Sequence, residues 1–123
     1  AQLGYTRLGD AMSHASGVWT FPETGIWLVE GLYNYSGAGY ARGQIEYYAG
    51  SGNYAVIAAG NSGTGNGDYT QNTVSAQIDV TNSTSGNSGV HVKFTQGGTS
   101  ATLRGGTGTG ALTQFRFTKL GNT

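Results

Sequence analysis

The sequence contains no cysteine and a single proline, Pro22. Without cysteine the chain forms no disulfide, no thiolate nucleophile and no thiolate metal site. Charge is also scarce: only 10% of the residues are charged, and the six basic residues cancel the six acidic ones. An average globular domain has about 25% charged residues. Binding to nucleic acid or to an anionic membrane needs a basic surplus, so we expect neither partner.

Long apolar runs are absent, so no segment approaches the roughly 20 residues that span a bilayer. Residues 1–10 also lack the layout of a secretory signal. Glycine is abundant, at 23 of 123 residues, but shows no three-residue period, which excludes a collagen helix. Because 37% of the residues are apolar, the chain has enough material for a core. We therefore expect one folded domain over residues 1–123.

Apolar residues follow the two-residue period of β-strands, as in residues 74–80, where they alternate with polar ones. Clusters of Gly, Thr, Ser and Asn leave no convincing helix. The sequence predicts an all-β sandwich or barrel. The expected strands are residues 5–8, 18–21, 26–35, 40–49, 54–59, 70–81, 90–96, 101–104 and 112–120. The expected Gly-, Ser- and Asn-rich connections are residues 36–39, 50–53, 60–68, 82–89, 97–100 and 105–110.

Two of the expected strands carry bulky apolar residues on both faces. In residues 26–35 one face holds Trp27, Val29, Tyr33 and Tyr35, and the other holds Ile26, Leu28 and Leu32. In the closing strand Phe115 and Phe117 face away from Leu112 and Leu120. A sandwich of this size has only one interior, so the pattern predicts a second buried surface, supplied by identical copies of the chain.

The two ends of the chain are similar in sequence. Residues 5–10 (YTRLGD) are nearly repeated at residues 117–122 (FTKLGN). We interpret this as equivalent edge positions for the first and last strands, which would bring the termini close together; coincidence is the alternative.

Nucleophilic catalysis needs a general base beside a Ser, Cys or Thr, and only His14 and His91 offer an imidazole. His91 lies on the polar side of an alternating strand, so we expect it to be exposed. His14 lies in residues 11–17, a connection or short strand, where we expect a hydrogen-bonding or interface role. No Gly-x-Ser-x-Gly pattern accompanies either histidine.

The acidic residues are dispersed: Asp10, Glu23, Glu30, Glu46, Asp68 and Asp79. Glu30 shares a strand face with leucines, so we expect it to pair with Arg42 or Arg116, or to turn outward at a bulge near Gly31. An acid catalyst for glycoside hydrolysis is the alternative.

Glycine clusters at residues 63–67 and 105–110 are expected to be turns, because no helix or lysine follows them as in a phosphate-binding loop. We expect no catalytic, cofactor or metal residues, although a calcium ion held by loop carbonyls with Asp68 or Asp79 is an open alternative. Tyr69, beside Asp68 in a polar loop, is a hypothetical partner contact.

Residues 13–29 (SHASGVWTFPETGIWLV) contain an aromatic-Pro-x-x-Gly-x-aromatic pattern. This stretch resembles the start of the jelly-roll heads of the tumour necrosis factor and complement-head superfamily. Together with residues 115–123 (FRFTKLGNT), it is similar to carboxy-terminal domains of structural proteins from tailed phages, particularly marine and cyanobacterial ones. Residues 50–87 match only in the rhythm of their strands.

The resemblance implies a jelly roll of about ten antiparallel strands that assembles as a trimer and has no enzymatic activity. It implies a virion location, most directly as the head of a tail fibre or appendage that contacts the host surface. Alternatives are a capsid-decorating trimer and an extracellular glycan-binding or glycan-degrading domain. The expected partners are its own copies, other virion proteins and a host-surface glycan or protein. No ligand residue carries over, because binding in such heads uses loops that differ between members.

Overall fold

The computed structural model describes residues 10–65, 69–105 and 113–123. Throughout these residues the chain is all-β, and every strand pairing is antiparallel. The strands are β1 (Ser13–Ala15), β2 (Val18–Thr20), β3 (Gly25–Tyr48), β4 (Ala55–Thr64), β5 (Tyr69–Val80), β6 (His91–Leu103) and β7 (Gln114–Gly121). No helix suited to crossing a bilayer occurs in this part of the chain.

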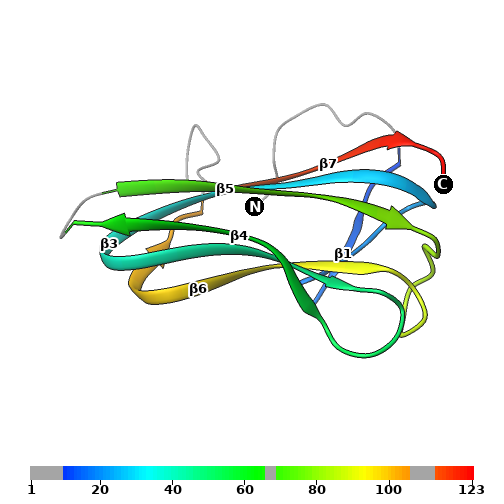
Figure 1. Cartoon of the computed structure of the whole chain (residues 1–123), viewed down its shortest axis with the longest axis horizontal. Helices are drawn as coiled ribbons and strands as arrows, with labels where there is room; N and C mark the ends of the chain where they lie inside the picture. Colours follow the sequence, from blue (N-terminus) through cyan, green and yellow to red (C-terminus); the bar gives the residue numbers. More distant parts are fainter. Residues whose placement is uncertain (1–9, 66–68, 106–112) are drawn as a thin grey trace.

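The long strand β3 belongs to both layers of the structure. Its first half lies between β5 and β7, and its second half lies between β4 and β6. Strands β2 and β1 extend the second layer beyond β6, giving the order β1-β2-β6-β3-β4. Figure 1 shows β3 running along one layer, turning at one end of the molecule and returning along the other. The two layers face each other as in a β-sandwich, which confirms the expected all-β class.

Glycines allow the paired strands β3 and β6 to turn this corner together. Gly37, Gly39 and Gly98 have φ angles of 105°, 115° and 115°, values that L-residues with side chains seldom adopt. The register between β3 and β6 shifts between Gly37 and Ala41. Residues 36–39 and 97–100 were expected as connections, and that prediction is wrong: each is a bend within a continuous strand.

Other expected boundaries also change. The expected connection at residues 60–68 is wrong at its start, because β4 continues to Thr64. Residues 11–17 were expected to be either a connection or a short strand, and residues 13–15 form the short strand β1. The expected strand at residues 5–8, residues 5–9 of the first copy of the near-repeat, and Leu112 lie outside the described residues, whereas the second copy (residues 117–122) lies at the end of β7.

The core lies between the two layers. Twelve apolar residues are buried there: Phe21, Trp27, Val29, Tyr33, Tyr35, Ala41, Ile45, Val74, Ile78, Val80, Val90 and Val92. The alternation predicted for residues 74–80 is confirmed: Val74, Ile78 and Val80 are buried, Ala76 is half-buried, and the residues between them are exposed.

The closing strand shares this interior. Phe115 packs edge-on against Tyr33, with ring centres 5.6 Å apart, and stacks on Phe94 at 3.9 Å. Phe117 lies 5.3 Å from the Trp19 ring centre. The Phe115 and Phe117 rings pack against the core but stay half-buried, as do Ile26, Leu28 and Leu32 on the other face of β3. The second buried surface expected between identical copies therefore stays a prediction.

Two stacked tyrosines should make the fold sensitive to alkali. The rings of Tyr33 and Tyr35 lie 6.1 Å apart and are almost parallel. Burial raises the pKa of Tyr35 to about 12 and raises the pKa of Tyr33 as well. An unfolded chain releases these protons near pH ~10, so it then binds fewer protons than the folded chain. Stability is therefore expected to fall as the pH rises from about 10 towards 12.

Urea unfolding midpoints measured through this pH range check the prediction. The Tyr35→Phe variant removes one of the two ionising groups and a buried hydroxyl that has no hydrogen-bond partner. It should lose less stability with rising pH than the parent protein. Equal pH dependence of the two proteins would contradict the assignment.

Candidate functional site: a hollow beside His91

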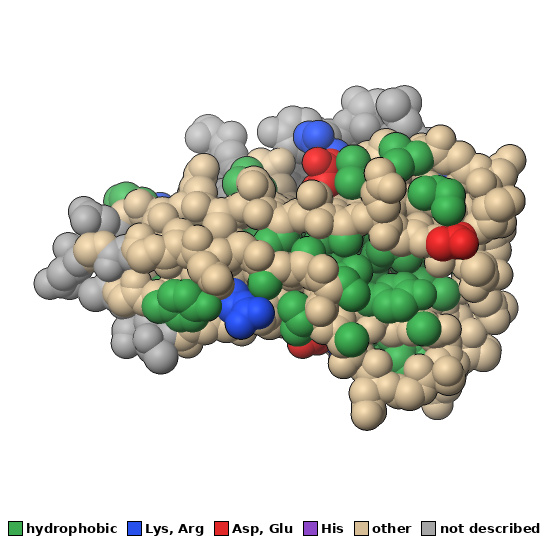
Figure 2. Space-filling view, viewed as in Figure 1, with side chains coloured by type: hydrophobic (Ala, Val, Ile, Leu, Met, Phe, Trp, Pro, Cys, Tyr) green, Lys and Arg blue, Asp and Glu red, His purple; other side chains and the backbone are tan. Residues whose placement is uncertain are grey.

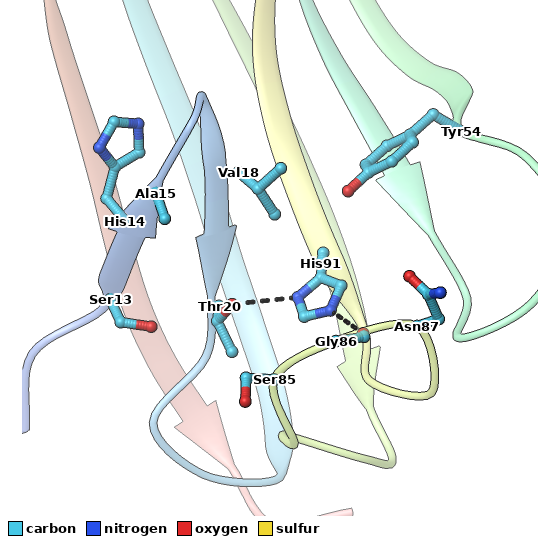
Figure 3. A pocket seen from close by; sticks show the side chains of 10 residues that line it. All are labelled: Ser13, His14, Ala15, Val18, Thr20, Tyr54, Ser85, Gly86, Asn87 and His91. Atoms are coloured by element: carbon cyan, nitrogen blue, oxygen red, sulfur yellow. Dashed lines mark hydrogen bonds between the residues drawn. The ribbon is translucent and has the colours of Figure 1, made fainter.

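A hollow of about 340 Å³ lies on the outer side of the β1-β2-β6-β3-β4 layer. Strands β1, β2 and β6 form its floor, and the connections at residues 49–54 and 81–90 form two of its walls (Figure 3). The lining residues are Ser13, His14, Ala15, Val18, Thr20, Tyr54, Ser85, Gly86, Asn87 and His91.

His91 is held rigidly in the floor of the hollow. Its side chain is only 5% exposed, so the expectation of an exposed histidine is wrong. Its Nε2 lies 2.7 Å from the Gly86 carbonyl, which only accepts hydrogen bonds, so Nε2 carries a proton. Its Nδ1 lies 3.2 Å from the Thr20 hydroxyl and, in the neutral ring, accepts from it (Figure 3). Both ring nitrogens therefore have partners, and neither is free to act as a general base.

Hydrogen bonds within the connection at residues 81–90 fix its fold over His91. Val90 donates its backbone N–H to the Asn82 carbonyl at 2.8 Å. The Asn82 side chain donates to the Ser88 carbonyl at 2.9 Å and accepts from the Thr84 N–H at 3.0 Å. These asparagine contacts form a compact loop of the Asx type. The wall of the hollow is thus preformed.

Aromatic rings support the opposite wall. Tyr54 stacks on Tyr48 with ring centres 5.2 Å apart, and the Lys93 ammonium lies 3.8 Å from the Tyr54 ring centre. Tyr48 also stacks on His91 at 6.0 Å and donates its hydroxyl to the Asn87 carbonyl at 2.8 Å. Desolvation raises the pKa of Tyr54, so its phenol stays protonated at neutral pH and can donate a hydrogen bond.

His14 does not join His91 in a catalytic arrangement. Its ring turns away from the hollow (Figure 3) and lies 4.5 Å from the Trp19 ring centre, on the exposed strand β1. No acidic side chain lines the hollow. The described residues therefore do not bring a nucleophile, a free base and an orienting carboxylate together here.

The ion pair expected for Glu30 is confirmed. Arg116 on the neighbouring strand β7 lies 4.0 Å from the Glu30 carboxylate, and Arg116 rather than Arg42 is the partner. The pair is largely exposed, so it contributes little to stability. A second ion pair joins Lys119 to Glu23 at 2.9 Å.

The remaining candidates lie away from the hollow. Tyr69 is 67% exposed, and Arg104 lies over its ring at 4.3 Å, so its role as a partner contact stays a hypothesis. Asp79 is exposed on β5, and Asp68 lies outside the described residues. Within those residues no three His, Cys, Asp or Glu side chains gather as metal ligands.

Sequence reasoning missed the hollow itself. Residues 82–89 were expected only as a connection, and nothing in their composition indicates that they fold back over His91. The sequence around Tyr54 and Asn87 also contains no motif that indicates a binding site. Comparison with known proteins finds no protein-family model that matches the chain and no match among curated proteins. The functional argument therefore depends on the fold and on the chemistry of this hollow.

Proposed function

We propose that the chain is a non-catalytic binding domain: the trimeric jelly-roll head of a phage tail fibre or appendage that contacts the host surface. The observation that carries the binding role is the hollow beside His91. The hollow is preformed and open to solvent at one side of the β-sandwich. The His91 ring in its floor has both nitrogens hydrogen-bonded. Such a site is suited to recognition rather than to bond cleavage.

The jelly-roll topology and the virion location are part of this proposal. Two facing antiparallel layers joined by continuous strands support a jelly roll. The similarity of residues 13–29 and 115–123 to phage structural domains supports the location.

Strand β4 supports assembly of several copies. It lies at the end of its layer and contains neither charge nor proline (AVIAAGNSGT), although exposed edge strands usually carry such residues to prevent pairing. Val56 and Ile57 on β4 are 46% and 42% exposed. Figure 2 shows hydrophobic side chains gathered on this side of the molecule, between β5 and the strands of the other layer. A neighbouring copy would cover this surface.

Antibody labelling of purified phage particles tests the location. The proposal predicts label at the tail appendages. Label spread over the capsid would favour the decoration alternative and contradict the tail assignment, and unlabelled particles would contradict any virion role. Turnover of host glycans by the purified protein, abolished by changing acidic residues, would contradict the non-catalytic role.

A further inference from the structure

The hollow beside His91 presents hydrogen-bonding groups that the protein itself does not use. The hydroxyls of Ser13, Tyr54 and Ser85 and the side-chain amide of Asn87 line it, and none of them is hydrogen-bonded within the described part of the chain. Figure 3 shows the Tyr54 hydroxyl directed into the hollow, opposite Val18 and His91. A bound molecule with several hydroxyl groups would satisfy these donors and acceptors together.

The charges of the residues around the hollow limit the class of ligand that it can bind. The lining residues of the hollow include no Asp, Glu, Lys or Arg. Of the two histidines, His14 turns its ring away (Figure 3) and His91 has both ring nitrogens hydrogen-bonded. Lys93, on the same face of β6, holds its ammonium against the Tyr54 ring and pairs in register with Glu46, a residue of opposite charge. An anionic or cationic ligand entering such a site would lose water without gaining a partner of opposite charge. The hollow is therefore suited to a neutral ligand.

The floor of the hollow adds an apolar surface. Val18 and Ala15 line the hollow together with the flat His91 ring, whose two nitrogens are already hydrogen-bonded to Thr20 and Gly86. A ligand ring with C–H groups on one face and hydroxyls around its edge fits this combination. The volume of about 340 Å³ lies near the lower end of known ligand pockets, which span about 300 to 1,000 Å³. It accommodates one such ring rather than a long chain.

We propose that this hollow binds one neutral sugar residue, a pyranose that carries neither a carboxylate nor an amine. The protein contributes the Tyr54 hydroxyl and the Asn87 amide as hydrogen-bonding groups, and Val18 as an apolar contact. The expected source of the sugar is the end of a host-surface glycan. This part of the inference rests on the proposed function. With three copies in one head, three weak sites would bind a glycan-bearing surface together.

Saturation-transfer NMR on the purified full chain tests this inference with methyl glycosides of neutral hexoses as probes. An anionic glucuronide and a cationic glucosaminide serve as charged controls. Neutral glycosides should bind and the charged ones should not. The Tyr54→Phe variant keeps the ring against Tyr48 and Lys93 but loses the hydroxyl, so its affinity should fall about tenfold. Tyr40→Phe removes an exposed hydroxyl that bonds Asn61 away from the hollow, and it should leave affinity unchanged.

The source of the sugar is tested by comparing a free methyl glycoside with a surface that displays many copies of the same sugar. Much tighter binding to the surface supports a glycan, whereas equal binding per sugar contradicts the glycan source. Preference for a charged glycoside, or unchanged affinity of Tyr54→Phe, overturns the inference. If no neutral glycoside binds, the inference fails while a tail location measured by antibody labelling still stands. Sugar binding by a capsid-located protein would instead contradict the proposed function alone.

Discussion

Replacing Gly43 with alanine is expected to cost about 3 kcal/mol of folding free energy, at the upper end of the range for overpacked cores. Gly43 is buried in β3, facing the other layer. A Cβ atom there would lie 2.7 Å from the Asn72 side-chain oxygen and would overlap the Tyr33 ring. Tyr33 is only 1% exposed and donates its hydroxyl to the Gln44 carbonyl at 2.6 Å, so the ring cannot move aside freely.

Urea denaturation of Gly43→Ala measures this loss, and Gly121→Ala at the exposed end of β7 is the matched control. A Cβ atom at Gly121 would meet no atom within 4 Å, so the control should retain its stability or gain slightly from the stiffer unfolded chain. If the two variants were equally stable, the close packing of β3 against Tyr33 would be refuted.

Replacing Phe117 with alanine is expected to cost about 3 kcal/mol, the lower end of the range for truncated core phenylalanines, because Phe117 is only half-buried. Its ring contacts lie within one chain: Trp19 at 5.3 Å, Phe94 at 5.7 Å and Phe21 at 6.0 Å between ring centres. The loss should therefore be the same at low and high protein concentration.

Leu120→Ala is the control for Phe117→Ala, because Leu120 lies on the same strand but is 51% exposed. It should change the unfolding free energy of the subunit by much less. If the loss of unfolding free energy in Phe117→Ala grew on dilution, the ring would pack at a contact between copies. That result would contradict its packing against the subunit core.

The two-residue period allowed much of the fold to be predicted. It gave the burial alternation of β5 correctly, because one face of that strand packs on the core. It did not distinguish a bend from a connection at Gly37, Gly39 and Gly98. Glycine with a positive φ occurs both in bends within a strand and in connections between strands. Which of the two forms depends on whether the neighbouring strand stays paired. Here β3 and β6 stay paired through the corner, so each continues as one strand.

The candidate site was less predictable. An ion pair of Glu30 was anticipated because this acid shares a strand face with leucines, but the choice of Arg116 over Arg42 follows only from the pairing of β3 with β7. The burial of His91 was not, since an alternating strand places it on the solvent face. That face is covered by residues 81–90, the connection that directly precedes His91, and the Gly86 carbonyl of this connection accepts a hydrogen bond from the His91 ring. The connection folds back over the strand through its own hydrogen bonds from Asn82 and Val90, and no periodic pattern in the sequence indicates this.

The proposed role as an assembled binding head is tested most directly by the mass of the purified protein at micromolar concentration, measured by sedimentation equilibrium. A chain with zero net charge and an uncharged edge strand has little repulsion to keep copies apart. The predicted result is a particle of three times the 12.7 kDa chain mass. A particle of 12.7 kDa that persists at that concentration would contradict the proposal.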